Sequence, residues 1–166
     1  VCAAVIMPLS PELLIEGVDD SKKLSAKRRE QLSELIKERA LAYAITEISN
    51  EEIDEINILQ ATRKGMREAL LALKIAPDAV LTDGNMTLDI PFPQQSLVHG
   101  DALSYSIGAA SIIAKVYRDA LMDKLAEAFP AYGFEKNKGY GTAAHIAAIK
   151  EAGLCPFHRR TFTKKL

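Results

Sequence analysis

The stretch "HGDALSYSIGAASIIAKVYRD", residues 99–119, joins an aspartate that follows a glycine to a long pattern of apolar residues. The apolar positions recur at helical spacing and are Ile107, Ala110, Ala114, Tyr117, Leu121, Leu125 and Ala128. This period predicts one helix over 101–129. Asp101 stands at its start, where an aspartate often caps a helix without binding any ligand.

Strands and helices are predicted to alternate on both sides of this stretch. Apolar runs and alternating patterns predict strands over 1–7, 41–48, 79–83 and 96–100. N-cap signals at Ser25, Ser49 and Thr142, each followed by a helical period, predict further helices over 26–39, 49–73 and 143–152. Interleaved strands and helices predict an α/β fold in one domain over 1–166, although four strands are few for so many helices.

Composition sets limits on the class of protein. The 166 residues are 48% hydrophobic, which is typical of a globular domain. No apolar run approaches the roughly 20 residues of a membrane helix, so we expect no membrane contact. Two cysteines are too few for a disulfide framework or a zinc site, which favours a reducing, cytoplasmic location.

The net charge of −1 is unevenly distributed along the chain. Residues 136–166 contain seven Lys or Arg and one acid, a charge of +6, so the rest of the chain carries −7. A basic C-terminal segment indicates contact with a polyanion. A solvated tail is the alternative interpretation.

Asp83 and Asp101 are the candidate metal ligands. Asp83 follows a short predicted strand in "TDGN" (82–85), and Asp-Gly is also a common turn pair. Adjacent strands would bring both aspartates to the edge of the sheet where α/β proteins bind ligands. Two facing carboxylates repel unless a cation lies between them, and Mg²⁺ prefers such oxygen ligands. Nucleases with two metals use more carboxylates than these two.

Three basic segments are candidates for contact with phosphates. Ser21, Lys22 and Lys23 precede a helix N-terminus, whereas the following Arg28 and Arg29 fit a solvated helix face. "KNKGYG" (136–141) places Tyr140 beside lysines, where an exposed ring can stack on a base or sugar. "HRRTF" (158–162) is a basic cluster. The alternative is that these residues are solvated or pack on the core.

The sequence resembles bacterial type 2 ribonuclease H (ribonuclease HII) along essentially its whole length. The resemblance is carried by residues 99–119 and by "DDSKKLS", "EIDEINILQAT", "LTDGN", "FPAYGFEKNKGYGT" and "HRRTF", in this order. It implies an RNase H-like fold, a mixed sheet flanked by helices with a C-terminal helical region over 136–166. It also implies Mn²⁺- or Mg²⁺-dependent endonucleolytic cleavage of RNA in RNA–DNA hybrids. The resemblance also implies incision 5′ of ribonucleotides embedded in duplex DNA, as in ribonucleotide excision repair. We expect the protein to be a cytoplasmic monomer.

The resemblance also implies roles for individual residues. Asp83 and Asp101 match two of four catalytic, metal-binding carboxylates, and Tyr140 matches the tyrosine that reads the RNA–DNA junction. The remaining matches are to substrate-binding positions, namely Ser21, Lys22, Lys23, Lys115, His158 and Arg159.

Two departures from the family pattern stand out. His99 replaces the usual lysine, which we expect to be tolerated. The family pattern begins with a strand whose Asp-Glu pair supplies two carboxylates, followed by a Gly-Arg-Gly loop that recognises the ribonucleotide 2′-hydroxyl. Neither the strand nor the loop occurs in residues 1–166. Asp54-Glu55 fits a solvated helix face and cannot replace the pair. We expect the missing strand to precede residue 1, and little nuclease activity from residues 1–166 alone.

The sequence leaves two alternatives to an active nuclease open. A catalytically inactive nucleic-acid-binding protein of the same fold would keep the basic segments but would not cut. A plain α/β structural domain would use its aspartates only as caps and turns.

Overall fold

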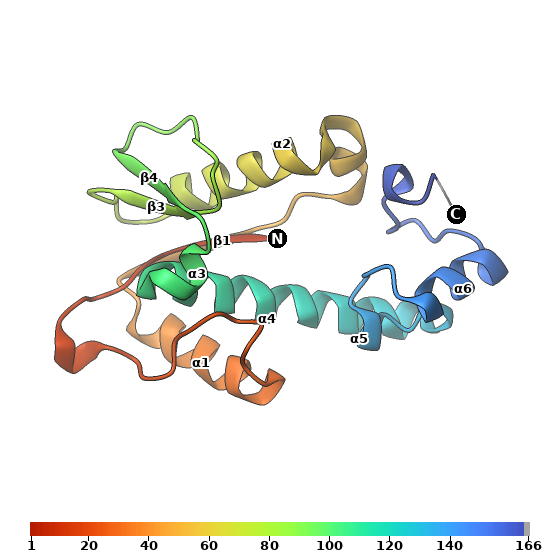
Figure 1. Ribbon diagram of the computed structural model, residues 1–166, viewed down its shortest axis with the longest axis horizontal. Coiled ribbons are helices and arrows are strands. Elements are labelled where there is room, and N and C mark those ends of the chain that lie inside the picture. Colours follow the sequence, from red (N-terminus) through yellow and green to blue (C-terminus); the bar gives the residue numbers. More distant parts are fainter. Residues whose placement is uncertain (165–166) are drawn as a thin grey trace. The chain divides into compact units, whose positions relative to one another are not determined.

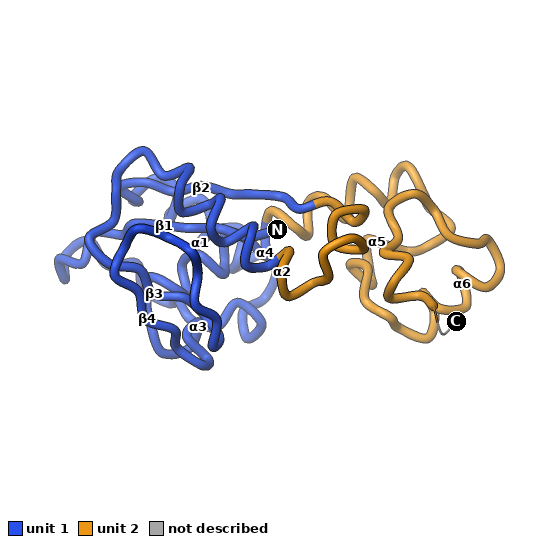
Figure 2. The backbone as a smooth tube through the Cα atoms, turned by 90° about the horizontal axis from the view of Figure 1, so that it is seen from above, with its two compact units in different colours: residues 1–48, 62–116 blue, residues 49–61, 117–166 orange. Residues whose placement is uncertain are grey.

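The computed structural model describes residues 1–164, which form two compact units (Figure 2). Unit 1 comprises residues 1–48 and 62–116, and unit 2 comprises residues 49–61 and 117–166. Within residues 1–164, no helix combines the length and the apolar character that crossing a membrane requires.

Four short strands form two small sheets in unit 1 (Figure 1). β1 (Cys2–Ile6) pairs antiparallel with β2 (Ala42–Thr46), and β3 (Val80–Asp83) pairs parallel with β4 (Gln94–Leu97). The register of the parallel pair runs from Val80 opposite Gln94 to Asp83 opposite Leu97. No strand ladder joins the two sheets within the described residues.

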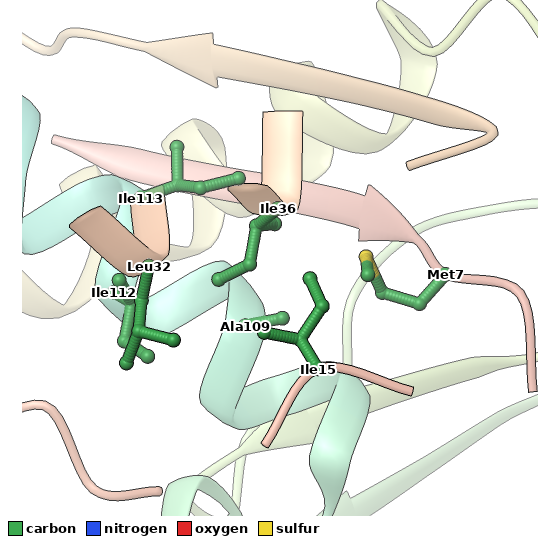
Figure 3. Close-up of a cluster of buried hydrophobic side chains, with 7 residues drawn as sticks. All are labelled: Met7, Ile15, Leu32, Ile36, Ala109, Ile112 and Ile113. Atoms are coloured by element: carbon green, nitrogen blue, oxygen red, sulfur yellow. The ribbon is translucent and has the colours of Figure 1, made fainter. Parts of the chain in front are cut away.

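The helices of unit 1 supply its core. The helix α1 (Ala26–Arg39) begins at Ser25, whose hydroxyl oxygen accepts a hydrogen bond from the Arg28 N–H at 3.3 Å. Its residues Leu32 and Ile36 are fully buried. They belong to a cluster that includes side chains of α4 (Tyr105–Ala128) and of the loops after β1 (Figure 3). The cluster consists of Met7, Ile15, Leu32, Ile36, Ala109, Ile112 and Ile113.

Unit 2 has a separate core. It is built by the C-terminal part of α4, a 3₁₀ turn η2 (Pro130–Tyr132), the short α5 (Phe134–Asn137) and α6 (Ala143–Ala152). The chain then ends the described region with a 3₁₀ turn, η3 (Arg160–Phe162). The buried cluster is Tyr132, Phe134, Ile149 and Cys155. Thr142 caps α6, as its sequence predicts, by accepting from the His145 N–H at 3.2 Å.

Two long predicted helices are interrupted, so those predictions were wrong in their continuity. The helix α2 (Asn50–Leu71) is broken at Asn57, whose φ of 68° and ψ of 164° are not helical. The Asn57 side-chain oxygen accepts from the N–H groups of Leu59 and Gln60, so it caps the second part of α2. The predicted helix over 101–129 is divided at the extended residue Ser104 into α3 (Gly100–Leu103) and α4.

Candidate functional site

Asp83 lies at the end of β3, and its carboxylate is held in place by the start of α3. Its Oδ1 accepts a hydrogen bond from the Gly100 N–H at 2.8 Å. A Cβ added to Gly100 would lie 2.6 Å from Ile107 Cδ1 and 3.3 Å from Asp83 Oδ1, so a side chain there would force these neighbours to shift. The contact therefore brings Asp83 beside the residue that precedes Asp101.

Asp101 does not act as a helix cap. The N-cap position of α3 is occupied by the exposed His99, which has a left-handed backbone with φ 57° and makes no side-chain capping bond. Asp101 lies in the first turn and is partly exposed. Within residues 1–164, its carboxylate has no hydrogen-bond or ion-pair partner. The carboxylate is thus available to a ligand near Asp83.

These two carboxylates fit part of a site for a hard divalent cation. Both provide the oxygen ligands that Mg²⁺ and Mn²⁺ prefer, and no basic side chain neutralises them in the described region. No group of three or more His, Cys, Asp or Glu that could hold a metal occurs among residues 1–164.

The loop before α1 is fixed by two arginines. Arg29 donates to the carbonyl oxygens of Ser21 at 2.9 Å and Leu24 at 2.6 Å, and Arg28 donates to that of Glu16 at 2.9 Å. The interpretation as a solvated helix face was therefore wrong for Arg29, which is partly buried, whereas Arg28 is exposed as that interpretation expects. Ser21 is buried, whereas the side chains of Lys22 and Lys23 are exposed.

Lys23 forms a long ion pair of 3.9 Å with Asp19, and both side chains are largely exposed, so the pair is weak. Lys115 is half-buried in the part of α4 that belongs to unit 1. Unit 1 thus contains both aspartates and the first group of predicted phosphate contacts.

Tyr140 lies in unit 2 and presents its ring to solvent, with 61% of the residue exposed. The guanidinium carbon of Arg118 lies 5.3 Å from the centroid of this ring, a cation–π contact. The sequence did not indicate this contact, because the two residues are 22 positions apart. No local pattern could have indicated it.

His158 is buried, with 7% of the residue exposed. Its Nδ1 accepts from the Cys155 N–H at 2.9 Å, and its Nε2 lies 3.1 Å from Nε2 of His145. Burial lowers the pKa of His158 below its ordinary value. Both ring nitrogens are therefore engaged inside unit 2 rather than presented to a ligand.

Arg159 is half-buried, and its guanidinium carbon lies 4.0 Å from the centroid of the Phe162 ring. Burial, followed by the positive charge of Arg118, lowers the pKa of the Arg159 guanidinium. Two cationic groups near an exposed tyrosine form a surface that an anion would stabilise.

The interpretation of Asp54 as part of a solvated helix face was also wrong. Its carboxylate accepts from the N–H groups of Arg160 at 2.6 Å and Thr161 at 2.9 Å, and from the Thr161 hydroxyl. Asn50, one turn earlier, donates to the Pro156 oxygen at 2.8 Å and the His158 oxygen at 3.3 Å. The first turns of α2 therefore hold the basic segment 158–162.

The chain thus combines a carboxylate at the end of β3, a second carboxylate in the first turn of α3 and a basic, aromatic surface. This combination defines the class of metal-dependent nucleic-acid hydrolases.

Comparisons with known proteins identify the family. The sequence model of the family described as Ribonuclease HII matches residues 1–165. "Ribonuclease HII 1" of Methylibium petroleiphilum is 56% identical over 163 residues, which are 98% of this chain and 81% of that protein. "Ribonuclease HII" of Alkaliphilus oremlandii is 50% identical over 170 residues, covering 99% of this chain and 82% of the relative. The chain therefore belongs to the ribonuclease HII family.

Solved structures agree with this assignment. The ribonuclease H2 from Pyrococcus horikoshii OT3 has a TM-score of 0.72 at 26% identity, covering 87% of this chain and 76% of its own. The PCNA:RNase HII complex from Archaeoglobus fulgidus contains a chain with a TM-score of 0.73 at 26% identity, covering 93% and 80%. The predicted α/β, RNase H-like fold is confirmed.

The protein is a ribonuclease H, an endonuclease and phosphodiester hydrolase that acts on RNA–DNA hybrids, in a family of metal-dependent nucleases. The family resemblance read from the sequence is confirmed. The catalytically inactive alternative has no support among these relatives.

Proposed function

We propose that Asp83 and Asp101 are catalytic metal ligands, and that the protein also incises duplex DNA 5′ of embedded ribonucleotides. The observation that carries the proposal is the hydrogen bond from Gly100 to Asp83, which joins the two carboxylate positions at the end of β3. Mg²⁺ or Mn²⁺ is the proposed ion, because carboxylate oxygens suit hard divalent cations.

Such an ion, when bound, activates water and stabilises the leaving oxygen during phosphodiester hydrolysis. Asp83 would hold it through Oδ2, because Oδ1 already accepts from Gly100. Asp101 would hold it through a carboxylate that makes no other bond in the described region. The chain's own contribution is to hold the Asp83 carboxylate in place before the substrate arrives and, among the described residues, to leave that of Asp101 unpaired nearby in the first turn of α3.

The proposed substrate contacts divide into two groups. In unit 1, Lys22, Lys23 and Lys115 would contact phosphates, with the buried Ser21 shaping the loop. In unit 2, Tyr140 would stack at the RNA–DNA junction and Arg159 would contact the backbone. His158 falls in the expected motif, but its side chain is buried, so we assign it a supporting role there.

The test is replacement of each aspartate by asparagine in the full-length protein. Asp83→Asn or Asp101→Asn should lower metal-dependent nicking of a duplex with one embedded ribonucleotide by at least about 100-fold, comparable to removing one main electrostatic group of a catalytic site. Gel-resolved single-turnover rates in Mg²⁺ and in Mn²⁺ measure the loss.

The exposed Asp78, also in unit 1, provides the control, and Asp78→Asn should leave the rate unchanged. Rates of Asp83→Asn and Asp101→Asn within about threefold of the unmodified enzyme would contradict the proposal.

We further propose that the protein acts as a cytoplasmic monomer. Both cysteines are free thiols, Cys2 partly exposed and Cys155 buried, which supports a reducing location, and the monomer is inferred from the family resemblance. Light scattering coupled to gel filtration should give the mass of one chain. A dimer mass at micromolar concentration would argue against this arrangement.

A further inference from the structure

Two histidines of unit 2 are buried and hydrogen-bonded, although the proposed catalytic site does not use them. His145 and His158 are 4% and 7% exposed, and their Nε2 atoms lie 3.1 Å apart. Aromatic rings enclose the pair, with the His158 centroid 4.8 Å from that of Tyr132 and the His145 centroid 5.4 Å from that of Phe134. Buried polar rings in such surroundings are costly unless each nitrogen has a partner.

The partners determine where each proton lies. The backbone N–H of Cys155 can only donate, so Nδ1 of His158 accepts and its Nε2 carries the hydrogen. The carbonyl oxygen of Tyr140 can only accept, so Nδ1 of His145, at 2.8 Å, carries the hydrogen and donates. Nε2 of neutral His145 is then free to accept from Nε2–H of His158.

One directional chain of hydrogen bonds results. It runs from the Cys155 N–H through His158 and His145 to the Tyr140 carbonyl, and every donor meets an acceptor. A proton added to the accepting nitrogen of either ring would break it, because two N–H groups would then face each other. The chain of hydrogen bonds is complete only with one hydrogen on each ring.

The chain ends at the residue proposed to read the junction. The neighbouring residues Lys138 and Gly139 have positive φ values of 48° and 76°, so this loop needs anchoring contacts to keep its shape. The Tyr140 N–H donates to the Asn137 oxygen at 2.8 Å, and Arg118 lies against the ring. The Tyr140 carbonyl accepts twice, from the Thr142 N–H at 2.8 Å and from Nδ1 of His145 at 2.8 Å, and the His145 bond is its side-chain contact.

We propose that His145 and His158 are positioning residues for Tyr140, coupling the C-terminal segment 155–159 to the tyrosine that stacks on substrate. This inference rests on the proposed role of Tyr140. Loss of the bond to the Tyr140 carbonyl would let the loop move and would weaken stacking at the junction. The preference for duplex DNA with one embedded ribonucleotide over a uniform RNA–DNA hybrid should fall, while cleavage of the uniform hybrid should change little.

The experiment measures kcat/KM for two substrates, duplex DNA with one embedded ribonucleotide and a uniform RNA–DNA hybrid. The quantity compared between variants is the first value divided by the second. Two variants of the full-length protein test the two nitrogens of His145 one at a time, because each keeps the hydrogen-bonding group of one nitrogen and removes that of the other. His145→Asn keeps a donor at the Nδ1 position and should retain most of the ratio. His145→Gln keeps an acceptor at the Nε2 position, loses the bond to Tyr140, and should lower the ratio about five- to tenfold, as loss of one hydrogen bond does.

The control separates positioning from stability. Ile149→Ala, in the same buried cluster as Phe134, should lower the melting temperature of unit 2 and leave the ratio unchanged. Melting curves of all variants establish that each is folded at the assay temperature. Equal ratios for His145→Asn and His145→Gln would overturn the inference.

Tyr140→Ala distinguishes this inference from the proposed function. An unchanged ratio in Tyr140→Ala would refute the role of the tyrosine itself. A lower ratio in Tyr140→Ala, with no loss in His145→Gln, would refute only the positioning chain. The double variant His145→Gln/Tyr140→Ala should be no worse than Tyr140→Ala, because both changes remove the same contact to substrate.

Discussion

Single residues of unit 2 link its stability to pH. The hydrogen-bond chain through His145 and His158 requires neutral rings, and burial lowers the pKa of His158. An unfolded histidine titrates near 6.5. The stabilisation is therefore present above about pH 6.5 and is lost as pH falls from there through the lower folded-state pKa, because the unfolded state binds more protons.

His158→Gln should therefore reduce the dependence of stability on pH. The melting temperature of the unmodified protein is expected to fall more steeply between pH 7 and pH 5 than that of the variant, which lacks the titrating ring. Calorimetry at several pH values measures both slopes. The exposed His99 is the matched control, and His99→Gln should keep the unmodified slope.

Asp54 is a second residue whose charge supports the C-terminal segment. The Thr161 hydroxyl, together with the Thr161 and Arg160 N–H groups, lowers the pKa of its carboxyl below the ordinary value. A lowered carboxyl pKa contributes stability above the unfolded value of about 3.9, and this is lost as pH falls through the folded value.

Asp54→Ala is expected to lower the melting temperature at pH 7, with a smaller difference near pH 3. It should also weaken binding of an RNA–DNA hybrid, because the segment carrying Arg159 loses its anchor. Glu55→Ala, at the exposed neighbouring acid, is the control for charge. Equal effects of the two variants would show that net charge, rather than the anchor, matters.

At the scale of elements, a single residue breaks α2, although the helical pattern of apolar residues continues on both sides of it. Asn57 has φ 68° and ψ 164°, a region that residues other than glycine rarely occupy. Its side-chain oxygen compensates by accepting from Leu59 and Gln60. The apolar period continues through the break, so periodicity alone predicts one helix.

Asn57→Ala should therefore destabilise the protein by about 1–2 kcal/mol, since it loses a cap and keeps the unfavourable backbone angle. Asn57→Gly loses the same cap but tolerates the angle, so it should cost less than Asn57→Ala. Urea unfolding of both variants measures the difference. A larger cost for glycine than for alanine would contradict the role of the backbone angle.

At the scale of the whole molecule, the functional groups are divided between the two units. The aspartates and the lysines of the α1 loop belong to unit 1, and the tyrosine and basic segment belong to unit 2. The helices α2 and α4 each contribute residues to both units. Binding of a hybrid duplex should therefore depend on cations from both.

Salt dependence tests this division. Lys22→Ala and Arg159→Ala should each reduce the slope of log Kd against log salt by about 1, as expected for one phosphate contact. The exposed Lys74 in unit 1 is the control, and Lys74→Ala should leave the slope unchanged. An unchanged slope in Arg159→Ala would assign the phosphate contacts to unit 1 alone.

The amino-acid sequence by itself determined what depends on neighbours along the chain. Ser25 and Thr142 cap their helices as predicted, and the four strands lie close to their predicted positions, because caps and periods act over a few residues. The family followed from motif order. Tertiary structure decided the hydrogen bond between Gly100 and Asp83, the burial of His158 and the anchoring of Thr161 by Asp54. The two hydrogen bonds join positions 17 and 107 residues apart, and no local spacing encodes them.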